Sequence, residues 1–142
     1  MRAESNLGGL LGKASRLLSN RFNNDLKVHN LTVEQWSLLA VLWSKDAQTQ
    51  KSLQEALLKD KATINSLVTY LAKNAFISKL KDSTDKRSFI ISLTNKGKQL
   101  QNTTIPIAIQ NITKATESIE REDLERTLLV LNQIINNLTK ET

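Results

Sequence analysis

The sequence contains no cysteine, one histidine, one proline and four glycines in 142 residues. The absence of cysteine excludes disulfides, thiolate metal sites, cysteine nucleophiles and redox sensing by cysteine oxidation. Because His29 is the only imidazole, a histidine-rich site for a transition metal is not expected either. We therefore predict a protein with neither a metal nor a cofactor.

Long apolar runs are also missing. No run of apolar residues approaches the roughly 18 that a membrane span requires. Residues 1–5 also lack the apolar stretch of a secretory signal. We expect a cytoplasmic protein with no membrane partner. The sequence also lacks a glycine-rich phosphate loop, a nucleophile elbow and a credible pair of catalytic carboxylates, so we do not expect an enzyme.

The composition fits one soluble globular domain, with 39% hydrophobic and 24% charged residues. The net charge of +6 is unevenly distributed: residues 46–100 hold ten basic and five acidic side chains, whereas residues 101–142 hold four and six. A polyanion would dock on the positive middle segment. Solvated surfaces also carry basic excess, so charge alone does not establish nucleic-acid binding.

The most informative stretch, residues 75–97, predicts a β-hairpin with a basic tip. Residues 76–81 and 89–93 have the pattern of short, half-buried strands, and residues 82–87 between them are all polar and rich in turn formers. An isolated hairpin is unstable in water, so it must rest on the helices around it. A basic hairpin on a small helical domain is suited to gripping duplex DNA.

Apolar periodicity predicts two helices before this segment. Apolar residues recur at three- and four-residue steps over residues 7–26. A second helix opens at Thr32, which forms a capping-box pattern with Gln35 and precedes Trp36 and Trp43.

A third helix over residues 50–58 and a fourth from Asp60 to about Asn74 are joined so closely that they predict a helix-turn-helix. The fourth helix keeps its polar side chains on one side, where Asn65 carries an amide that can pair with the N6 and N7 edge of adenine. A polar outer face is equally typical of any surface helix.

Two further helices are expected after the hairpin. Thr94 can cap a fifth helix, which Pro106 should kink or split. The last helix starts in an acidic group and carries an apolar seam. The seam needs a partner, which is the first helix of the same chain, a second subunit, or, as we favour, both. Its residues are Leu124, Leu128, Leu131, Ile135 and Leu138.

The chain resembles the MarR family of bacterial winged-helix transcription regulators. The resemblance rests on the run Leu31 to Trp36, on Asp85-Lys86-Arg87, and on the run Ile90 to Gly97. It implies a mainly α fold with a small β-hairpin in a single domain of residues 1–142. Within it, a winged helix-turn-helix over residues 32–98 is flanked by dimerisation helices over residues 1–30 and 99–142. It further implies a homodimer on double-stranded DNA with a pseudo-palindromic operator.

The resemblance also assigns roles to residues. The fourth helix would enter the major groove, Arg87 would reach the minor groove, and Asp85 would hold the wing in shape. The DNA-binding set is Lys51, Lys61, Ala62, Thr63, Asn65, Ser66, Thr69, Lys86 and Arg87. The dimerisation set adds Leu7, Leu10 and Leu11 to the seam.

This sequence departs from the family pattern in its recognition helix. Ser66 and the pair Thr69-Tyr70 stand where relatives often have charged residues, so the lysines and Arg87 are expected to carry more of the phosphate contacts. Ala75 replaces the usual glycine after the helix, and Asn74 is expected to take over the left-handed cap.

Relatives often bind small aromatic or anionic molecules in a cleft, and the ligand releases DNA. The residues expected to border such a cleft are Arg16, Phe22, Trp36 and Trp43. The two tryptophans are seven apart on one helical face, which is more typical of a core. The leading hypothesis is a dimeric repressor; the alternative is a winged-helix module that binds protein instead of DNA.

Overall fold

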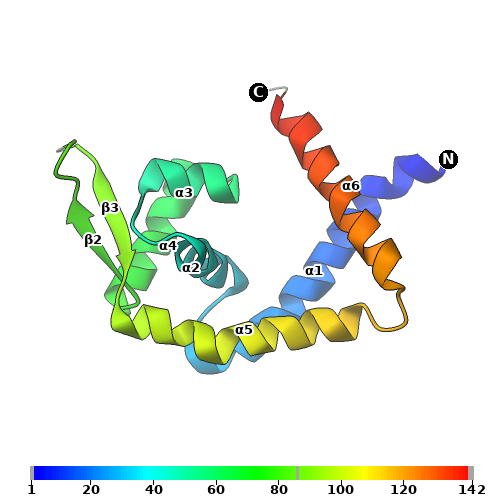
Figure 1. The fold of residues 1–142 in the computed structure, drawn as a ribbon, viewed down its shortest axis with the longest axis horizontal. Coiled ribbons are helices and arrows are strands. Elements are labelled where there is room, and N and C mark those ends of the chain that lie inside the picture. Colours follow the sequence, from blue (N-terminus) through cyan, green and yellow to red (C-terminus); the bar gives the residue numbers. More distant parts are fainter. Residues whose placement is uncertain (1, 86, 141–142) are drawn as a thin grey trace.

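The computed structural model describes residues 2–85 and 87–140, which form helices and a small antiparallel sheet at one end of the molecule (Figure 1). The predicted class, mainly α with a β-hairpin, is confirmed. The α-helices are α1 (Leu7–Leu26), α2 (Val33–Ser44), α3 (Gln50–Leu57), α4 (Lys61–Lys73), α5 (Asn95–Ala115) and α6 (Arg121–Lys140). The remaining elements are the 3-10 turns η1 (Ala3–Asn6) and η2 (Lys27–His29) and the strands β1 (Gln48–Thr49), β2 (Ile77–Lys81) and β3 (Phe89–Leu93).

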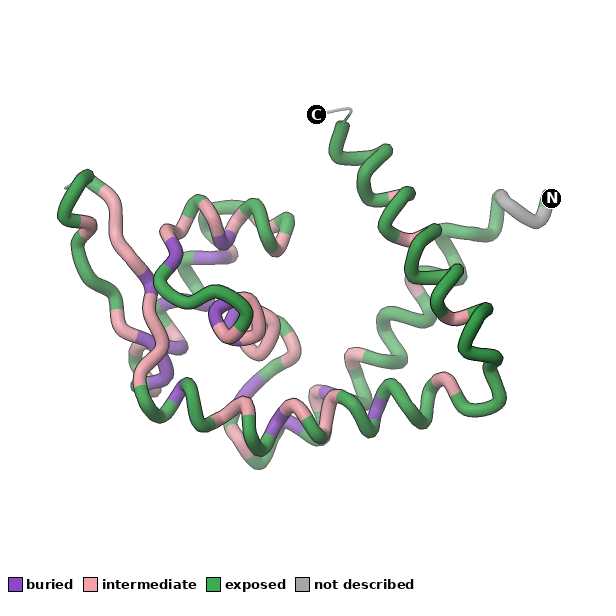
Figure 2. Tube along the Cα trace, viewed as in Figure 1, coloured by how far each residue is buried: buried purple, intermediate pink, exposed green. Residues whose placement is uncertain are grey.

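The helices α2, α3 and α4 gather with the sheet into one lobe. From this lobe α5 runs along α1 to the opposite end of the molecule, where α6 turns back beside the N-terminal half of α1 (Figure 1). Buried residues concentrate in the lobe and where α5 joins it, whereas α6 is almost entirely exposed (Figure 2). The core of the lobe consists of Leu38, Leu39, Leu42, Leu53, Ile64, Leu67, Val68, Leu71, Phe76, Ile77 and Ile91.

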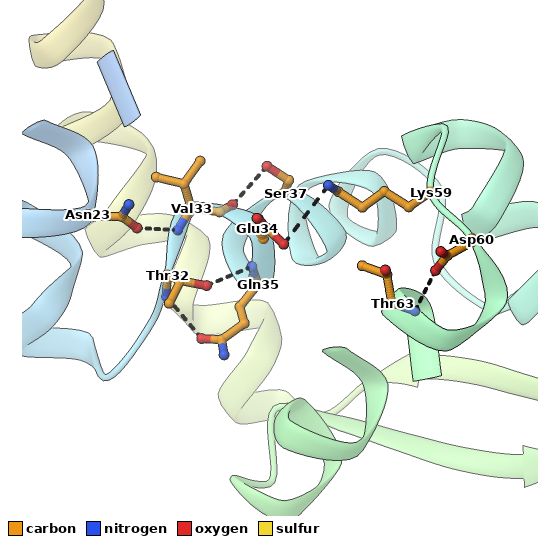
Figure 3. Close-up of polar contacts among 9 residues, drawn as sticks. All are labelled: Asn23, Thr32, Val33, Glu34, Gln35, Ser37, Lys59, Asp60 and Thr63. Carbon is orange, nitrogen blue, oxygen red and sulfur yellow. Dashed lines mark hydrogen bonds and ion pairs between the residues drawn. The ribbon is translucent and has the colours of Figure 1, made fainter. Parts of the chain in front are cut away.

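Side-chain caps fix where the helices of the lobe begin. The predicted capping box is confirmed, because Gln35 N–H donates to Thr32 Oγ1 at 3.2 Å and Thr32 N–H donates to Gln35 Oε1 at 2.9 Å (Figure 3). Asp60 Oδ1 accepts a hydrogen bond from Thr63 N–H at 2.8 Å and so caps α4. Between α3 and α4 the chain turns at Leu58, whose φ is 53°.

The sheet contains a strand that the sequence analysis did not predict. Its order is β1-β3-β2, with Gln48 opposite Ile91 at one edge and Lys81 opposite Phe89 near the hairpin turn. Asp46 Oδ1 accepts a hydrogen bond from the backbone N–H of Leu93 at 2.9 Å, which ties the segment before β1 to the end of β3. The hairpin therefore stands on a third strand as well as on helices.

The prediction that Asn74 supplies the left-handed cap of α4 is wrong. Asn74 has φ −90°, and Ala75 itself adopts φ 63°. Two backbone hydrogen bonds require this geometry: Ala75 N–H donates to Ala72 at 3.0 Å, and Phe76 N–H donates to Leu71 at 2.9 Å. These bonds place the left-handed residue after the last helical turn, whatever its side chain.

The sequence predicts that Pro106 kinks or splits the fifth helix, and a split does not occur. The helix α5 continues through this residue from Asn95 to Ala115. Proline leaves the carbonyl of Asn102 without its helical donor. Both residues are exposed, so water can hydrogen-bond this carbonyl.

The apolar seam of α6 is only partly covered within the chain. Leu131 is half-buried and lines a hollow with Leu7 and Leu11 of α1. Leu128 and Leu138 remain 53% and 60% exposed. Thus α1 takes up one part of the seam and leaves the rest open. Within the described residues, no helix is both long and apolar enough to cross a membrane.

Candidate nucleic-acid interface

One face of α4 is buried in the core of the lobe, and the opposite face is exposed. Its apolar side chains are buried in the core of the lobe, and Asp60 fixes its first turn. The hydrogen bonds that Thr63 donates hold the pKa of the Asp60 carboxyl below its usual value. The opposite face exposes the predicted residues Lys61, Ala62, Asn65, Ser66 and Thr69, whereas Thr63 is half-buried.

The C-terminal half of this exposed face is hollowed. Asn65, Ser66, Thr69, Tyr70 and Lys73 line the hollow. The Tyr70 hydroxyl donates to the backbone carbonyl of Asn30, at the end of η2. This bond ties the exposed side of α4 to the segment between α1 and α2.

A contact that the sequence analysis missed joins α4 to α3. The Gln50 side-chain amide donates from Nε2 to Asn65 Oδ1. The two residues are 15 positions apart, and no local pattern signals their pairing. The helix-turn-helix brings them together because α3 and α4 pack against each other.

The wing turn is organised by its own aspartates. Asp85 Oδ1 accepts a hydrogen bond from Arg87 N–H at 3.0 Å and lies 3.6 Å from Arg87 Nε. Asp82 N–H donates to the Ser88 carbonyl at 3.0 Å, which closes the turn. The hydrogen bonds that Thr84 donates, from its backbone first, lower the pKa of the Asp82 carboxyl. The Arg87 side chain itself is 93% exposed.

The predicted cationic residues come from three elements of one lobe. Lys61 lies at the start of α4, Lys51 is exposed on α3, and Arg87 lies in the turn between β2 and β3. Lys86 lies outside the described residues. Figure 3 also shows that Lys59 Nζ, in the turn between α3 and α4, lies 3.9 Å from Glu34 Oε2 at the start of α2.

Three of the four residues predicted to border a ligand cleft, Phe22, Trp36 and Trp43, pack against one another. The ring of Trp36 packs edge to face between Phe22, 5.0 Å away, and Trp43, 5.7 Å away. Trp36 Nε1 donates to Thr104 Oγ1 and Trp43 Nε1 to the Gly97 carbonyl, both at 2.9 Å. Arg16 is exposed on α1. The three rings pack α1, α2 and α5 together, and a ligand role for these four residues stays a prediction.

Within the described part of the chain, no three histidine, aspartate or glutamate side chains gather in a way that could hold a metal ion. The exposed face of α4 and the wing offer hydrogen-bonding and cationic side chains. These groups can contact base edges and phosphates.

Known proteins resemble this chain in both sequence and fold. The organic hydroperoxide resistance transcriptional regulator of Bacillus subtilis is 29% identical over 107 residues, which cover 75% of this chain and 73% of the relative. A MarR protein from Peptoclostridium difficile superposes with a TM-score of 0.91 at 21% identity, covering 96% of this chain and 89% of the other. The S. aureus MepR–DNA complex gives a TM-score of 0.84 at 22% identity, covering 92% and 96%.

A family model settles the relationship. The model for the transcriptional regulator SarA/Rot family matches residues 21–104, which is more than half of the chain. The matched segment includes the helix-turn-helix and the wing, and the fold is the MarR-type winged helix that the sequence motifs indicate. The chain therefore belongs to the SarA/Rot family of transcriptional regulators.

Proposed function

We propose that this protein is a dimeric, sequence-specific DNA-binding transcription regulator. The helix α4 enters the major groove, and the wing contacts the neighbouring backbone and minor groove. One observation carries this proposal: the apolar face and both ends of α4 are fixed, yet its polar face is exposed in the same lobe as the exposed Arg87. A structural neighbour of the same fold, MepR, is known in complex with DNA.

The proposed dimer uses the apolar surface at the opposite end of the molecule. Residues 1–30 and 99–142 supply it, and residues 32–98 supply the DNA-binding part. Contiguous exposed apolar patches on a protein surface mark interaction sites. The exposed large apolar residues of α1, the second half of α5 and α6 include Leu7, Leu10, Leu11, Leu17, Ile109, Ile112, Leu128, Leu129, Ile135 and Leu138.

We further propose repression that a small aromatic or anionic ligand relieves, bound near Arg16, Phe22, Trp36 and Trp43. Trp36 and Trp43 are the only tryptophans, so their fluorescence reports on this region. Titration with aromatic carboxylates should change the emission and weaken DNA binding together. If DNA is released without any change in emission, the ligand lies elsewhere.

Salt-dependent binding separates this function from the alternative, a protein-binding module. Duplexes should be selected from a randomised library and their affinity measured over a salt series. A protein that contacts Z phosphates loses affinity with a log–log slope of about −0.9Z, so a steep slope is expected. A shallow slope with no selected sequence would favour the protein-binding module.

The Arg87→Ala variant tests the wing. We expect it to weaken binding to the selected duplex by about 1–3 kcal/mol, because the arginine side chain is 93% exposed and its ion pair is with Asp85 of the same turn. Arg121→Ala is the matched control, since Arg121 is 91% exposed on α6 and, among the described residues, pairs only with Glu125 of the same helix. Equal affinity of the Arg87 variant and the wild type at moderate salt would remove the wing from the interface.

A further inference from the structure

Two indole hydrogen bonds join α2 to α5. Trp36 Nε1 donates to Thr104 Oγ1 at 2.9 Å. Trp43 Nε1 donates to the Gly97 carbonyl, also at 2.9 Å. The Thr104 side chain is fully buried, and its hydroxyl donates its own hydrogen to the Leu100 carbonyl at 2.8 Å, so the oxygen faces the indole as an acceptor. Among the described residues, no other hydrogen bond connects these two helices.

The two bonds attach α2 to α5 at two separate places. Gly97 lies near the start of α5, where the chain enters from β3, and Thr104 lies further along the helix. The two positions are separated by two helical turns, about 10.5 Å along the axis of α5. A helix held at one place can rotate about it, whereas two attachments this far apart fix the angle at which α2 crosses α5.

This crossing angle decides where the lobe points. The helix α2 belongs to the lobe with α3, α4 and the sheet, whereas α5 runs on to the apolar end proposed for the dimer (Figure 1). In a dimer, the angle therefore sets the distance and the rotation between the two copies of α4. Adding one base pair between half-sites moves them apart by about 3.4 Å and turns one against the other by about a tenth of a turn.

We infer that Trp36 and Thr104 are positioning residues that set the half-site spacing accepted by the dimer. Their bond is the attachment nearer to the dimer end of α5, so it prevents the lobe from turning about the attachment at Gly97. The inference rests on the proposed function, because it requires two copies of α4 on one duplex. Neither residue needs to touch DNA for this role.

Two substitutions at Thr104 separate the hydrogen bond from the packing. Thr104→Val nearly keeps the shape of the side chain but removes the acceptor of the indole hydrogen. Thr104→Ser keeps the hydroxyl and loses only the methyl group. Because the position is fully buried, both variants should lose stability. Only Thr104→Val should loosen the spacing, and circular dichroism checks that both variants are folded.

Trp36→Phe removes the same bond from the donor side. Phenylalanine keeps an aromatic ring between Phe22 and Trp43, which pack on either side of Trp36, but it has no N–H group. Its effect on spacing should match that of Thr104→Val. Combining the two substitutions should add nothing further, because both remove one interaction.

The measurement uses duplexes that carry the half-site selected by the wild type at spacings that differ by one base pair. The wild type should favour one spacing. In Thr104→Val and Trp36→Phe, the loss of affinity caused by one added or removed base pair should shrink by about threefold or more, the scale of one hydrogen bond. Thr104→Ser should keep the wild-type spacing penalty. A purely structural role would weaken binding at every spacing alike.

The outcomes separate this inference from the proposed function. If the wild type selects no paired half-sites, the proposed function itself fails. If it does select them, three results overturn the inference alone. These are equal binding of the wild type at all spacings, an unchanged penalty in Thr104→Val or Trp36→Phe, and a penalty in Thr104→Ser as small as in Thr104→Val.

An unchanged penalty would also identify what holds the lobe instead. The start of α2 is linked to α1, where Asn23 Oδ1 accepts a hydrogen bond from Val33 N–H at 2.8 Å. That link would then suffice to fix the lobe. A smaller penalty in both variants that lack the indole bond, with Thr104→Ser like the wild type, supports the inference.

Discussion

At the scale of single residues, Ala75 holds a backbone conformation that suits glycine. Its φ of 63° places the Cβ atom close to the following carbonyl, which costs a non-glycine residue about 1–2 kcal/mol. Ala75→Gly should therefore raise the free energy of unfolding by about 1 kcal/mol, measured as a higher urea midpoint.

The control for Ala75→Gly lies three residues earlier, in the last turn of α4. Ala72 has helical backbone geometry, so Ala72→Gly should lower the free energy of unfolding by roughly 0.5–1 kcal/mol. Loss of stability in both variants would mean that the cap needs the alanine methyl group for packing.

The Asp60 cap makes the stability of α4 depend on pH. Hydrogen bonds from Thr63 lower the pKa of Asp60 in the folded protein. The ionised carboxylate therefore stabilises the fold fully at pH values above the unfolded pKa of about 3.9. That contribution is lost as the pH falls through the lower, folded pKa. Asp60→Ala should lower the urea midpoint at pH 7, and its deficit against the wild type should shrink below pH 4.

Asparagine offers the matched control because it caps helices without titrating. The difference between Asp60→Asn and Asp60→Ala should stay constant over the same pH range. A deficit of Asp60→Ala that is as large at pH 2.5 as at pH 7 would show that the charge of Asp60 contributes nothing.

At the scale of elements, helices with local signals were predictable and long-range pairings were not. The capping box at Thr32, the cap at Asp60 and the buried stripe of α4 each lie within a few residues, so the pattern alone locates them. The strand β1 has two residues and exists only because β3 lies beside it, so it has no periodicity of its own. The pairing of Gln50 with Asn65 was missed for the same reason.

Gly97 shows how one element is joined to another. A Cβ atom at this position would overlap the carbonyl oxygen of Phe76, which also accepts hydrogen bonds from Thr94 N–H and Oγ1, both at 3.1 Å. The start of α5 is thereby held against the start of β2. Gly97→Ala should lower the free energy of unfolding by about 1–3 kcal/mol, because the backbone of the junction must move.

Gly8 supplies the contrast for Gly97. Within the described residues, no neighbouring atom lies within 4 Å of a Cβ atom at position 8 in α1, so Gly8→Ala should stabilise the protein by roughly 0.5–1 kcal/mol. Chemical denaturation of both variants measures the two effects side by side. A Gly97→Ala protein as stable as the wild type would show that the junction between α5 and β2 yields easily.

At the scale of the whole molecule, the lobe of α2, α3, α4 and the sheet, here called the reading lobe, lies at one end of α5. The apolar surface proposed for the dimer lies toward the other end (Figure 1). Two reading lobes can meet half-sites on one face of a duplex only if a dimer holds them about 34–36 Å apart, or a multiple of this. The apolar side chains of α1, α5 and α6 form the surface available for that dimer. The seam on α6 was predictable from spacing, whereas the part that α1 covers was not, because the crossing of two helices is set by the fold.

Leu128 is the sharpest position at which to break the proposed dimer. Leu131 is half-buried against α1 in the same chain, so a charge there would also disturb the monomer. Leu128 is 53% exposed, and Leu128→Glu would bury an unpaired carboxylate only in a dimer. Light scattering should show a monomer, and its circular dichroism should match the wild type. Its binding to the selected duplex should be weaker by roughly tenfold or more, because the two DNA-binding lobes are no longer linked.

The control for Leu128→Glu is an equally exposed leucine at the other end of the molecule. Leu80 is 61% exposed on β2, so Leu80→Glu should leave the oligomeric state unchanged. If Leu128→Glu remained a dimer with full affinity, the interface would have to lie outside the α6 seam. In that case the DNA-reading lobes would be linked through the exposed apolar side chains of α1 and α5, or through those that α6 carries outside the seam, Leu129 and Val130.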